Sequence, residues 1–181
     1  MAAGRLSSKK PVQASLPSFR GLNPASEAAS RSKRANRKTD SLHEILLRRE
    51  LTKLGLRYRK YAGDLLGNPD LVFRTAKVVV FCDGDFWHGR VWVRLNRNLL
   101  RRHNASYWIA KIARNRERDR EVSRKLTKAG WHVVRIWETD ILNDPQQAAR
   151  SIHALVGRKL SERIVPHGSV RGIASRNTRL P

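Results

Sequence analysis

The chain has 181 residues, a length that suits one domain with flexible ends and a single hydrophobic core. Its 38 Lys and Arg exceed its 15 Asp and Glu, and the formal net charge of +23 indicates a polyanionic partner, with nucleic acid as the first candidate. No apolar run is long enough to span a membrane, and the single cysteine, Cys82, excludes both an intramolecular disulfide and a zinc site of several thiolates.

Both ends of the chain have the composition of solvated segments. Residues 1–38 are rich in Ala, Ser and Pro, lack apolar periodicity, and contain a single acid, Glu27, among many Lys and Arg. Residues 161–181 have a similar composition. We therefore predict a disordered basic arm over 1–38, a folded domain over 39–160 and a disordered basic tail over 161–181.

The folded domain begins with a helix. Ser41 and Glu44 have the spacing of a capping box, and leucines recur at helical spacing behind them. Gly55 then stops the pattern. The spacing predicts a helix over 42–54.

Three segments with strand propensity follow, and they are LRYRK at 56–60, PDLVF at 69–73 and KVVVF at 77–81. The last two are separated by a short turn, which predicts a hairpin. The run at 77–81 is continuously apolar, so we expect it to be buried on both faces.

The rest of the domain alternates helix and strand. Apolar residues step by three and four along 105–129 and predict one long helix whose stripe is Ile112, Asn115, Asp119, Val122 and Leu126. Residues 131–137 predict a strand, and Asp144 with Pro145 begins a last helix that we expect to end near residue 160. This order predicts an α/β fold with a mixed central sheet flanked by helices.

Acids gather around the predicted hairpin. The stretch GNPDLVFRTAKVVVFCDGDFWHGR, residues 67–90, contains Asp70, Asp83, Asp85 and His88. A carboxylate at the start of one strand and groups just past its neighbour can converge at one sheet end and offer oxygen ligands to a hard cation. Magnesium needs only one or two protein carboxylates, because substrate phosphates complete its coordination. The sequence therefore predicts a magnesium site that acts on a polyanion.

From about residue 31 to 142, the chain resembles the very short patch repair (Vsr-type) DNA endonucleases, a branch of the PD-(D/E)XK nuclease superfamily. The matching pieces are RSKRANRKTDSLHE, GLRYR, NPDLVF, VVFCDGDFWHG, YWIAKIARNRERD and GWHVVRIWE. The PD pair alone is weak evidence, but these pieces in this order are specific. The resemblance implies a restriction-endonuclease-like core.

The resemblance implies roles for five residues. Asp70 matches the family's metal-binding aspartate, and the backbone carbonyl of Cys82 matches a further metal ligand. His88 matches the histidine proposed to activate the attacking water, a task that suits a group titrating near neutral pH. Glu44 matches a first-helix glutamate near the metal waters, and Asp83 would bind metal-linked water or support His88.

The resemblance also implies contacts with DNA. Phe86, Trp87 and Trp108 match aromatic residues that wedge into the duplex, where contacts to bent DNA offset the cost of unstacking a base step. These residues would read the shape of the DNA rather than base edges. The basic arm would clamp phosphates and enter a groove through Arg31, Lys33, Arg34, Arg37 and Lys38.

The chain departs from the family at a structural zinc site that several members hold. Asp85 stands in place of the first cysteine, Arg90 and Trp92 follow nearby, and Thr139 comes after the WE pair. We therefore expect no structural zinc. We hypothesise that Asp85 and Arg90, with apolar packing by Trp92, brace this loop instead.

Most of these side chains also have a structural explanation. Asp70 and Asp83 can shape turns, and Glu44 can serve the capping box alone. The aromatic residues can belong to the core, and Cys82 can be a small buried residue. Asn115 and Asp119 interrupt an apolar stripe, so we expect them to tie the long helix to a nearby backbone or arginine.

The sequence and its resemblance together predict a Mg2+-dependent DNA endonuclease that nicks duplex DNA at a mismatched or distorted site, in very short patch-type repair. We expect one or two Mg2+ ions, double-stranded DNA as partner, a cytosine methyltransferase system nearby, and a monomeric, cytoplasmic protein without membrane contact. Two alternatives stay open. One is a restriction or mobile-element nuclease that cuts undamaged DNA, and the other is a non-catalytic DNA-binding protein.

Overall fold

The computed structural model describes residues 17–18, 20–22, 27 and 39–164. The predicted tail from residue 165 onward and nearly all of the predicted basic arm lie outside the described residues. The same holds for the arm residues expected to clamp DNA, which are Arg31, Lys33, Arg34, Arg37 and Lys38.

The chain divides into two compact units. Among the described residues, 39–84 with 120–164 form the first, which we call the sheet unit, and 85–119 belong to the second, which we call the helical unit. The sequence did not indicate this division, because one boundary falls inside a continuous helix, α5 (Ala105–Lys128).

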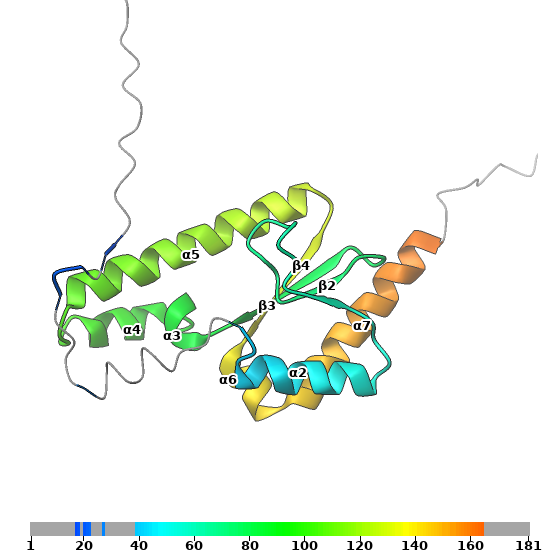
Figure 1. Ribbon diagram of the computed structural model, residues 1–181, viewed down its shortest axis with the longest axis horizontal. Coiled ribbons are helices and arrows are strands. Elements are labelled where there is room, and N and C mark those ends of the chain that lie inside the picture. Colours follow the sequence, from blue (N-terminus) through cyan, green and yellow to red (C-terminus); the bar gives the residue numbers. More distant parts are fainter. Residues whose placement is uncertain (1–16, 19, 23–26, 28–38, 165–181) are drawn as a thin grey trace, which may run out of the picture. The chain divides into compact units, whose positions relative to one another are not determined.

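The sheet unit is built on a four-stranded sheet in the order β1-β2-β3-β4 (Figure 1). Its strands are β1 (Arg59–Lys60), β2 (Leu71–Phe73), β3 (Val78–Asp83) and β4 (His132–Trp137). The first three pair antiparallel, and β4 pairs parallel with β3. The predicted mixed sheet and its hairpin are confirmed.

Helices cover both faces of this sheet. Three of them pack together on one face, and they are α2 (Leu42–Lys53), α6 (Glu138–Asn143) and α7 (Pro145–Ile164). The end of α5 covers the other face through Val122 and Leu126. The flanking helices complete the predicted α/β architecture.

Alternation along β3 decides which side chain enters which core. Val78 and Val80 pack under α2 and α7, whereas Val79 and Phe81 pack under α5. Both faces of the strand are buried, as its continuous apolar run predicts. The alternation continues to the end of the strand, so Cys82 and the residue after it point to opposite faces.

The start of α2 differs from the predicted capping box. Ser41 is the N-cap residue, but its side chain makes no hydrogen bond to a backbone N–H of the helix. Its Oγ donates instead to Oε1 of Glu44 at 2.7 Å, because a carboxylate attracts a donor strongly. Oε2 of Glu44 accepts from the N–H of Asp40, one residue ahead of the expected position.

Two other element boundaries differ from the prediction. The strand expected over 56–60 begins only at Arg59, and it ends at Lys60 as predicted, where Tyr61 takes a left-handed backbone with φ 46°. At the other end of the unit, α7 continues to Ile164, past the predicted end near residue 160.

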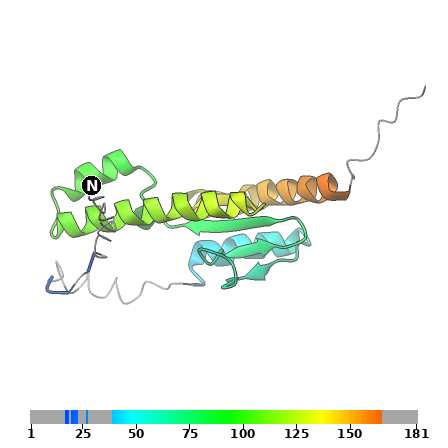
Figure 2. The ribbon, with the colours of Figure 1, turned by 90° about the horizontal axis from the view of Figure 1, so that it is seen from above.

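Within its described residues, the helical unit consists of α3 (Asp85–His88), α4 (Trp92–Leu99) and the first part of α5. Sequence reasoning missed α3 and α4, which are green in Figure 2, and also α6 of the sheet unit. Helix α4 begins without a side-chain cap and buries Leu99, the last of three apolar residues at helical spacing along it. None of the helices in the described residues is both long and apolar enough to cross a membrane.

Candidate active site

The turn before β2 holds Asp70 in a fixed position. Gly67 and Asn68 have left-handed backbones, with φ of 81° and 50°, which Gly and Asn tolerate best. A Cβ at Gly67 would lie 2.5 Å from Cγ1 of Val122 on α5, so the close approach requires glycine. Pro69 is fully buried beside it. The turn therefore has little freedom to move Asp70.

The carboxylate of Asp70 is anchored to β3. Its Oδ2 accepts a hydrogen bond from the N–H of Cys82 at 2.7 Å, and its main-chain carbonyl accepts one from the N–H of Tyr61 at 3.2 Å. The structure thus brings together the two segments that carry the predicted metal ligands, the Asp70 carboxylate and the Cys82 carbonyl. Oxygen donors of this kind fit a hard cation such as Mg2+.

The pKa of the Cys82 thiol is affected by the charges at this end of the sheet. Burial raises its pKa well above the usual value, and the negative charges of Asp70, Glu44 and Asp83 raise it further. The charges of the three acids thus influence one thiol at the end of β3, although the side chains of Cys82 and Asp83 point to opposite faces of the sheet. A thiol with so high a pKa is a poor nucleophile, which supports a structural role for Cys82.

Asp83, at the end of β3, is held by an arginine of β4. Nε of Arg135 donates to Oδ2 at 2.6 Å, and Nη2 donates to Oδ1 at 2.7 Å. The guanidinium also lies over the ring of Phe81, 4.8 Å from its centroid, and Asp83 is only 4% exposed. Because both carboxylate oxygens accept from Arg135, this geometry favours a role for Asp83 in supporting the surrounding structure over a role in binding metal-linked water.

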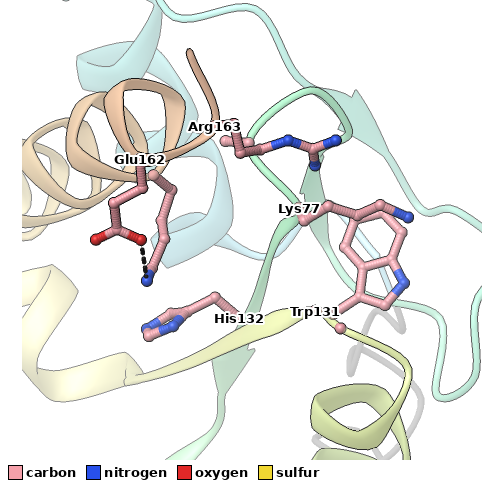
Figure 3. Close-up of a pocket in the computed structure, with 8 residues that line it drawn as sticks. Lys77, Trp131, His132, Glu162 and Arg163 are labelled. Carbon is pink, nitrogen blue, oxygen red and sulfur yellow. Dashed lines mark hydrogen bonds and ion pairs between the residues drawn. The ribbon is translucent and has the colours of Figure 1, made fainter. Parts of the chain in front are cut away.

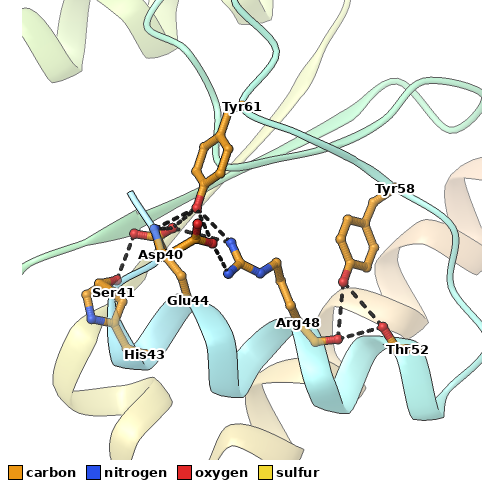
Figure 4. A network of polar contacts seen from close by, with 8 residues as sticks. All are labelled: Asp40, Ser41, His43, Glu44, Arg48, Thr52, Tyr58 and Tyr61. Atoms are coloured by element: carbon orange, nitrogen blue, oxygen red, sulfur yellow. Dashed lines mark hydrogen bonds and ion pairs between the residues drawn. The ribbon is translucent and has the colours of Figure 1, made fainter. Parts of the chain in front are cut away.

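Glu44 lies in a network of side chains from α2 and the segment after β1 (Figure 4). It is 7% exposed, and its Oε2 accepts a hydrogen bond from the hydroxyl of Tyr61 at 2.7 Å. Arg48, one helical turn later, places Nη1 3.5 Å from the same oxygen and pairs with Asp40. Sequence reasoning missed Tyr61, Arg48 and Asp40 as partners of Glu44. The available signal was the Glu44–Arg48 pair at the i,i+4 spacing of α2.

His88, in the helical unit, ends α3 and is paired with an acid of α5. Its Nδ1 lies 2.5 Å from Oδ2 of Asp119. This pairing orients the imidazole ring through Nδ1. Gly89, with φ 64°, lets the chain turn directly behind the histidine, because a Cβ there would lie 3.0 Å from the side chain of Ile112.

The polar residues in the stripe of α5 have clear partners. Nδ2 of Asn115 donates to the main-chain carbonyl of Trp87 at 2.9 Å, the backbone tie that the sequence predicted. Asp119 contacts Arg118 at 3.2 Å, but this arginine is its neighbour on the same helix, and the contact that ties Asp119 to another element is that with His88, which the sequence did not predict. An acid that interrupts the apolar stripe of a long helix was the signal for it.

The loop that departs from the family at its zinc site contains an ion pair. Nη1 of Arg90 lies 3.6 Å from Oδ1 of Asp85, and the Arg90 N–H donates to the Asp85 carbonyl at 3.0 Å. Trp92 packs against Arg116 of α5, whose guanidinium is 5.1 Å from the ring centroid. The hypothesised pairing of Asp85 with Arg90 is present.

The aromatic residues expected to contact DNA form one cluster in the helical unit. The ring centroids of Phe86 and Trp87 are 5.1 Å apart, and Trp108 lies 5.7 Å from the first and 5.8 Å from the second. Tyr107 extends the cluster at 5.0 Å from Trp108. All four side chains are half-buried, so each combines packing with an accessible edge.

The predicted site residues thus fall in both units. Glu44, Asp70, Cys82 and Asp83 gather in the sheet unit, whereas His88, Phe86, Trp87 and Trp108 belong to the helical unit. In the described part of the chain, no group of three or more His, Cys, Asp and Glu side chains is arranged to hold a metal ion.

A basic hollow of about 310 Å³ lies at the opposite end of β3, where β3 and β4 begin (Figure 3). Its charged and titratable lining residues are Lys77, His132, Lys159, Glu162 and Arg163. Lys159 pairs with Glu162 at 2.8 Å, and Nζ of Lys77 lies 4.7 Å from the ring centroid of Trp131.

Comparison with known proteins gives consistent matches. The model of the family "DNA mismatch endonuclease Vsr" matches residues 25–94. Type II nicking enzyme V.NmeDIP from Neisseria meningitidis serogroup C is 37% identical over 133 residues, which cover 74% of this chain and 88% of that relative. Type II nicking enzyme V.NaeI from Lentzea aerocolonigenes is 44% identical over 126 residues, which cover 67% of this chain and 74% of that relative. DNA mismatch endonuclease Vsr from Escherichia coli K12 is 33% identical over 140 residues, which cover 76% of this chain and 83% of that relative.

Proposed function

This chain belongs to the Vsr family of DNA mismatch endonucleases, and from that premise we propose that it nicks one strand of duplex DNA at a mismatched or distorted site, in a reaction that requires Mg2+. Endonuclease action on DNA is common to the family. One observation carries the proposal. The hydrogen bond of 2.7 Å from the Cys82 N–H to Oδ2 of Asp70 fixes an acid beside a main-chain carbonyl at the sheet end.

The sheet unit supplies the groups for metal binding. The carboxylate of Asp70 and the carbonyl of Cys82 would hold Mg2+, with substrate phosphate completing its coordination. When bound, the cation stabilises the negative charge that develops on the phosphate and on the leaving oxygen. Glu44 orders solvent beside the phosphodiester, and Asp83, neutralised by Arg135, keeps the end of β3 in place.

The helical unit supplies the general base. His88 accepts a proton from the attacking water at Nε2, while a new bond forms between the water oxygen and phosphorus and the bond to the leaving oxygen breaks. Asp119 stabilises the imidazolium that results, because its carboxylate is paired with Nδ1 at 2.5 Å. The support for these roles is the match of His88 to the family's FWH motif and its contact with Asp119.

DNA binding relies on aromatic and basic residues. The half-buried cluster of Phe86, Trp87 and Trp108 would insert between base steps, and distorted or mismatched steps unstack at lower cost. The arm residues Arg31, Lys33, Arg34, Arg37 and Lys38 would neutralise phosphates near the nick. The formal net charge of +23 supports this strong electrostatic contribution.

We propose that the enzyme needs no structural zinc. The ion pair between Asp85 and Arg90 at 3.6 Å supports this proposal, since it braces the loop where family members place ligands. One or two Mg2+ ions would then be the complete metal requirement. Elemental analysis of protein that was stripped of metal and then exposed to zinc should find no tightly held, stoichiometric zinc.

The biological setting has two candidates. Very short patch repair beside a cytosine methyltransferase, by a monomer in the cytoplasm, follows from the family resemblance. The several relatives named type II nicking enzymes favour the second candidate, a nuclease that accompanies a restriction system. Both settings require a nick rather than mere binding.

A nicking assay tests the function. The full chain is incubated with Mg2+ and a panel of end-labelled duplexes that differ only in one base pair, including T:G and its matched T:A control. We expect a nick in one strand at the T:G pair and far slower cleavage of the matched duplex. Equal cleavage of both duplexes would favour a nuclease of undamaged DNA, and binding without turnover in Mg2+ or Mn2+ would contradict the proposal.

A further inference from the structure

Tyr61 lies at the centre of the polar network shown in Figure 4. Its hydroxyl donates toward Oε2 of Glu44 at 2.7 Å and toward Oδ1 of Asp40 at the longer distance of 3.0 Å. The same oxygen accepts from the Asp40 N–H at 2.7 Å and from Nη1 of Arg48 at 2.8 Å. A phenol has one proton and two lone pairs. The capacity of this hydroxyl is therefore fully used, and the shorter distance assigns its proton to Glu44.

The main chain of Tyr61 is fixed as firmly as its hydroxyl. Its N–H donates to the carbonyl of Asp70 at 3.2 Å, which extends the pairing of Lys60 with Leu71 in β1 and β2. Its backbone has φ 46°, and Asp40 across the hydroxyl contact has φ 56°. Such left-handed conformations cost energy in residues other than glycine, and they persist only where the surrounding structure imposes them.

We propose that Tyr61 is a positioning residue of the reaction, which joins the carboxylate of Glu44 to the main chain of Asp70 and so fixes the relative position of the two acids. The inference rests on the function proposed above. No motif in the sequence pointed to Tyr61, which follows the strand-like segment 56–60 and lies outside the pieces that resemble the family.

The charges around the hydroxyl explain why a tyrosine is suited to this position. Glu44 and Asp40 are like-charged, and Arg48 compensates both through two different nitrogens. A neutral donor between them adds no further charge. Burial raises the pKa of Tyr61 to about 12, and the hydrogen bond to Glu44 contributes in the same direction, so the hydroxyl remains protonated at neutral pH.

The chain offers a matched control in Tyr58. Its hydroxyl also bridges the segment before β2 to α2, where it donates to the carbonyl of Arg48 at 3.2 Å and contacts Oγ1 of Thr52 at 3.3 Å. Neither of these partners is a carboxylate. Tyr58→Phe therefore removes a comparable contact between the same two segments, three residues earlier in the chain.

The test compares Tyr61→Phe, Tyr58→Phe, Glu44→Gln and the double variant Tyr61→Phe/Glu44→Gln. Single-turnover nicking of the preferred duplex is measured against Mg2+ concentration, together with thermal unfolding of each protein. We expect Tyr61→Phe to lower the nicking rate or the apparent Mg2+ affinity by about 10- to 100-fold, as for other groups that orient an active-site carboxylate. Tyr58→Phe should nick like the wild type at a similar thermal midpoint.

The double variant separates positioning from mere stability. If Tyr61 acts through Glu44, the double variant should be no slower than Glu44→Gln alone, because one contribution cannot be removed twice. Should Tyr61→Phe prove unfolded, Tyr61→His keeps an aromatic ring, accepts the left-handed backbone more readily, lacks the phenol hydroxyl and should show the same loss in a folded protein.

The outcomes are distinct. Nicking by Tyr61→Phe at the rate of Tyr58→Phe, or fully additive losses in the double variant, would overturn the inference and leave the proposed function standing. A wild-type chain that nicks no duplex in Mg2+ would overturn both.

Discussion

Where β3 begins, Lys77 and its neighbours line an exposed basic hollow, and where β3 ends, Cys82 and Asp83 reach a group of carboxylates with specific partners. At the first end, charged side chains lie at the surface, and Lys159 pairs with the exposed Glu162. At the second end, Asp70 is anchored by a main-chain N–H, and Asp83 by a bidentate guanidinium.

The difference shows that charged residues of one chain act in two ways, as individually paired acids at one end of β3 and as exposed cations that act together at the other. A buried carboxylate such as that of Asp83 costs free energy unless donors compensate it, so it depends on a particular neighbour. Exposed cations act through a shared field that salt screens, and one of them can replace another. Substitutions at the acidic end should therefore have large, specific effects, and those at the basic end small, general ones.

Among substitutions that leave the proposed metal ligands in place, the largest effect should come from the histidine. His88→Ala should lower the single-turnover nicking rate by about 10²- to 10⁴-fold, the usual contribution of a general base. Asp119→Asn should cause a smaller loss, because it retains the ring but weakens the interaction with the imidazolium. Gel-shift affinity for the same duplex should stay near the wild-type value in both. A His88→Ala enzyme as fast as the wild type would remove the histidine from the mechanism.

A large loss of stability is expected at the end of β3. Arg135→Met should lower the free energy of unfolding by about 3–5 kcal/mol, because it leaves the buried Asp83 without its guanidinium partner. Urea denaturation followed by circular dichroism measures the change. The comparison variant at the basic end is Lys159→Met, whose midpoint should barely move. Similar midpoints for the two variants would contradict the contrast between the two ends.

The turn that carries Asp70 should also be sensitive. Gly67→Ala introduces a Cβ 2.5 Å from Val122 in a left-handed backbone, and such overpacking should cost about 1–3 kcal/mol and reduce nicking as the turn shifts. Gly63→Ala is the control, since a Cβ at Gly63 meets nothing within 4 Å. Thermal unfolding and nicking are measured on both proteins. Equal behaviour would show that this turn does not determine the position of Asp70.

The smallest effects are expected at the basic hollow. Lys159→Met/Arg163→Met should leave the single-turnover rate at saturating protein unchanged. If either side chain binds phosphate, the slope of log affinity against log salt should fall by about 0.9 for each phosphate that is no longer neutralised. Fluorescence anisotropy over a salt series gives this slope. A drop in the saturated nicking rate would place this end of the sheet in the reaction.

Much of the sheet unit could be predicted because local and tertiary signals agree there. The continuous apolar run of β3 and the stripe positions Val122 and Leu126 predicted buried elements that the structure contains. The short helices α3 and α4 were not predicted, because α3 is a single turn that buries no residue and α4 has no side-chain cap. The spacing of Trp92, Leu95 and Leu99 was the available signal for α4.

The candidate site was predictable to the extent that motifs name its acids. The resemblance pointed to Asp70 and Glu44, but it could not supply the partners that hold them. The contact of Tyr61 with Glu44 joins residues 17 positions apart, and that of Arg135 with Asp83 joins residues 52 positions apart. Such pairs depend on strand register and helix placement, which spacing alone does not define.

The proposed mechanism requires that Asp70 holds the catalytic cation, and Asp70→Asn tests this most directly because it keeps the size of the side chain and removes only its charge. Strand nicking of a mismatched duplex is measured across a Mg2+ titration, with DNA affinity determined in parallel on the same protein. We expect no Mg2+-dependent nicking and a DNA affinity close to that of the wild type. Nicking with the rate and Mg2+ dependence of the wild type would contradict the mechanism.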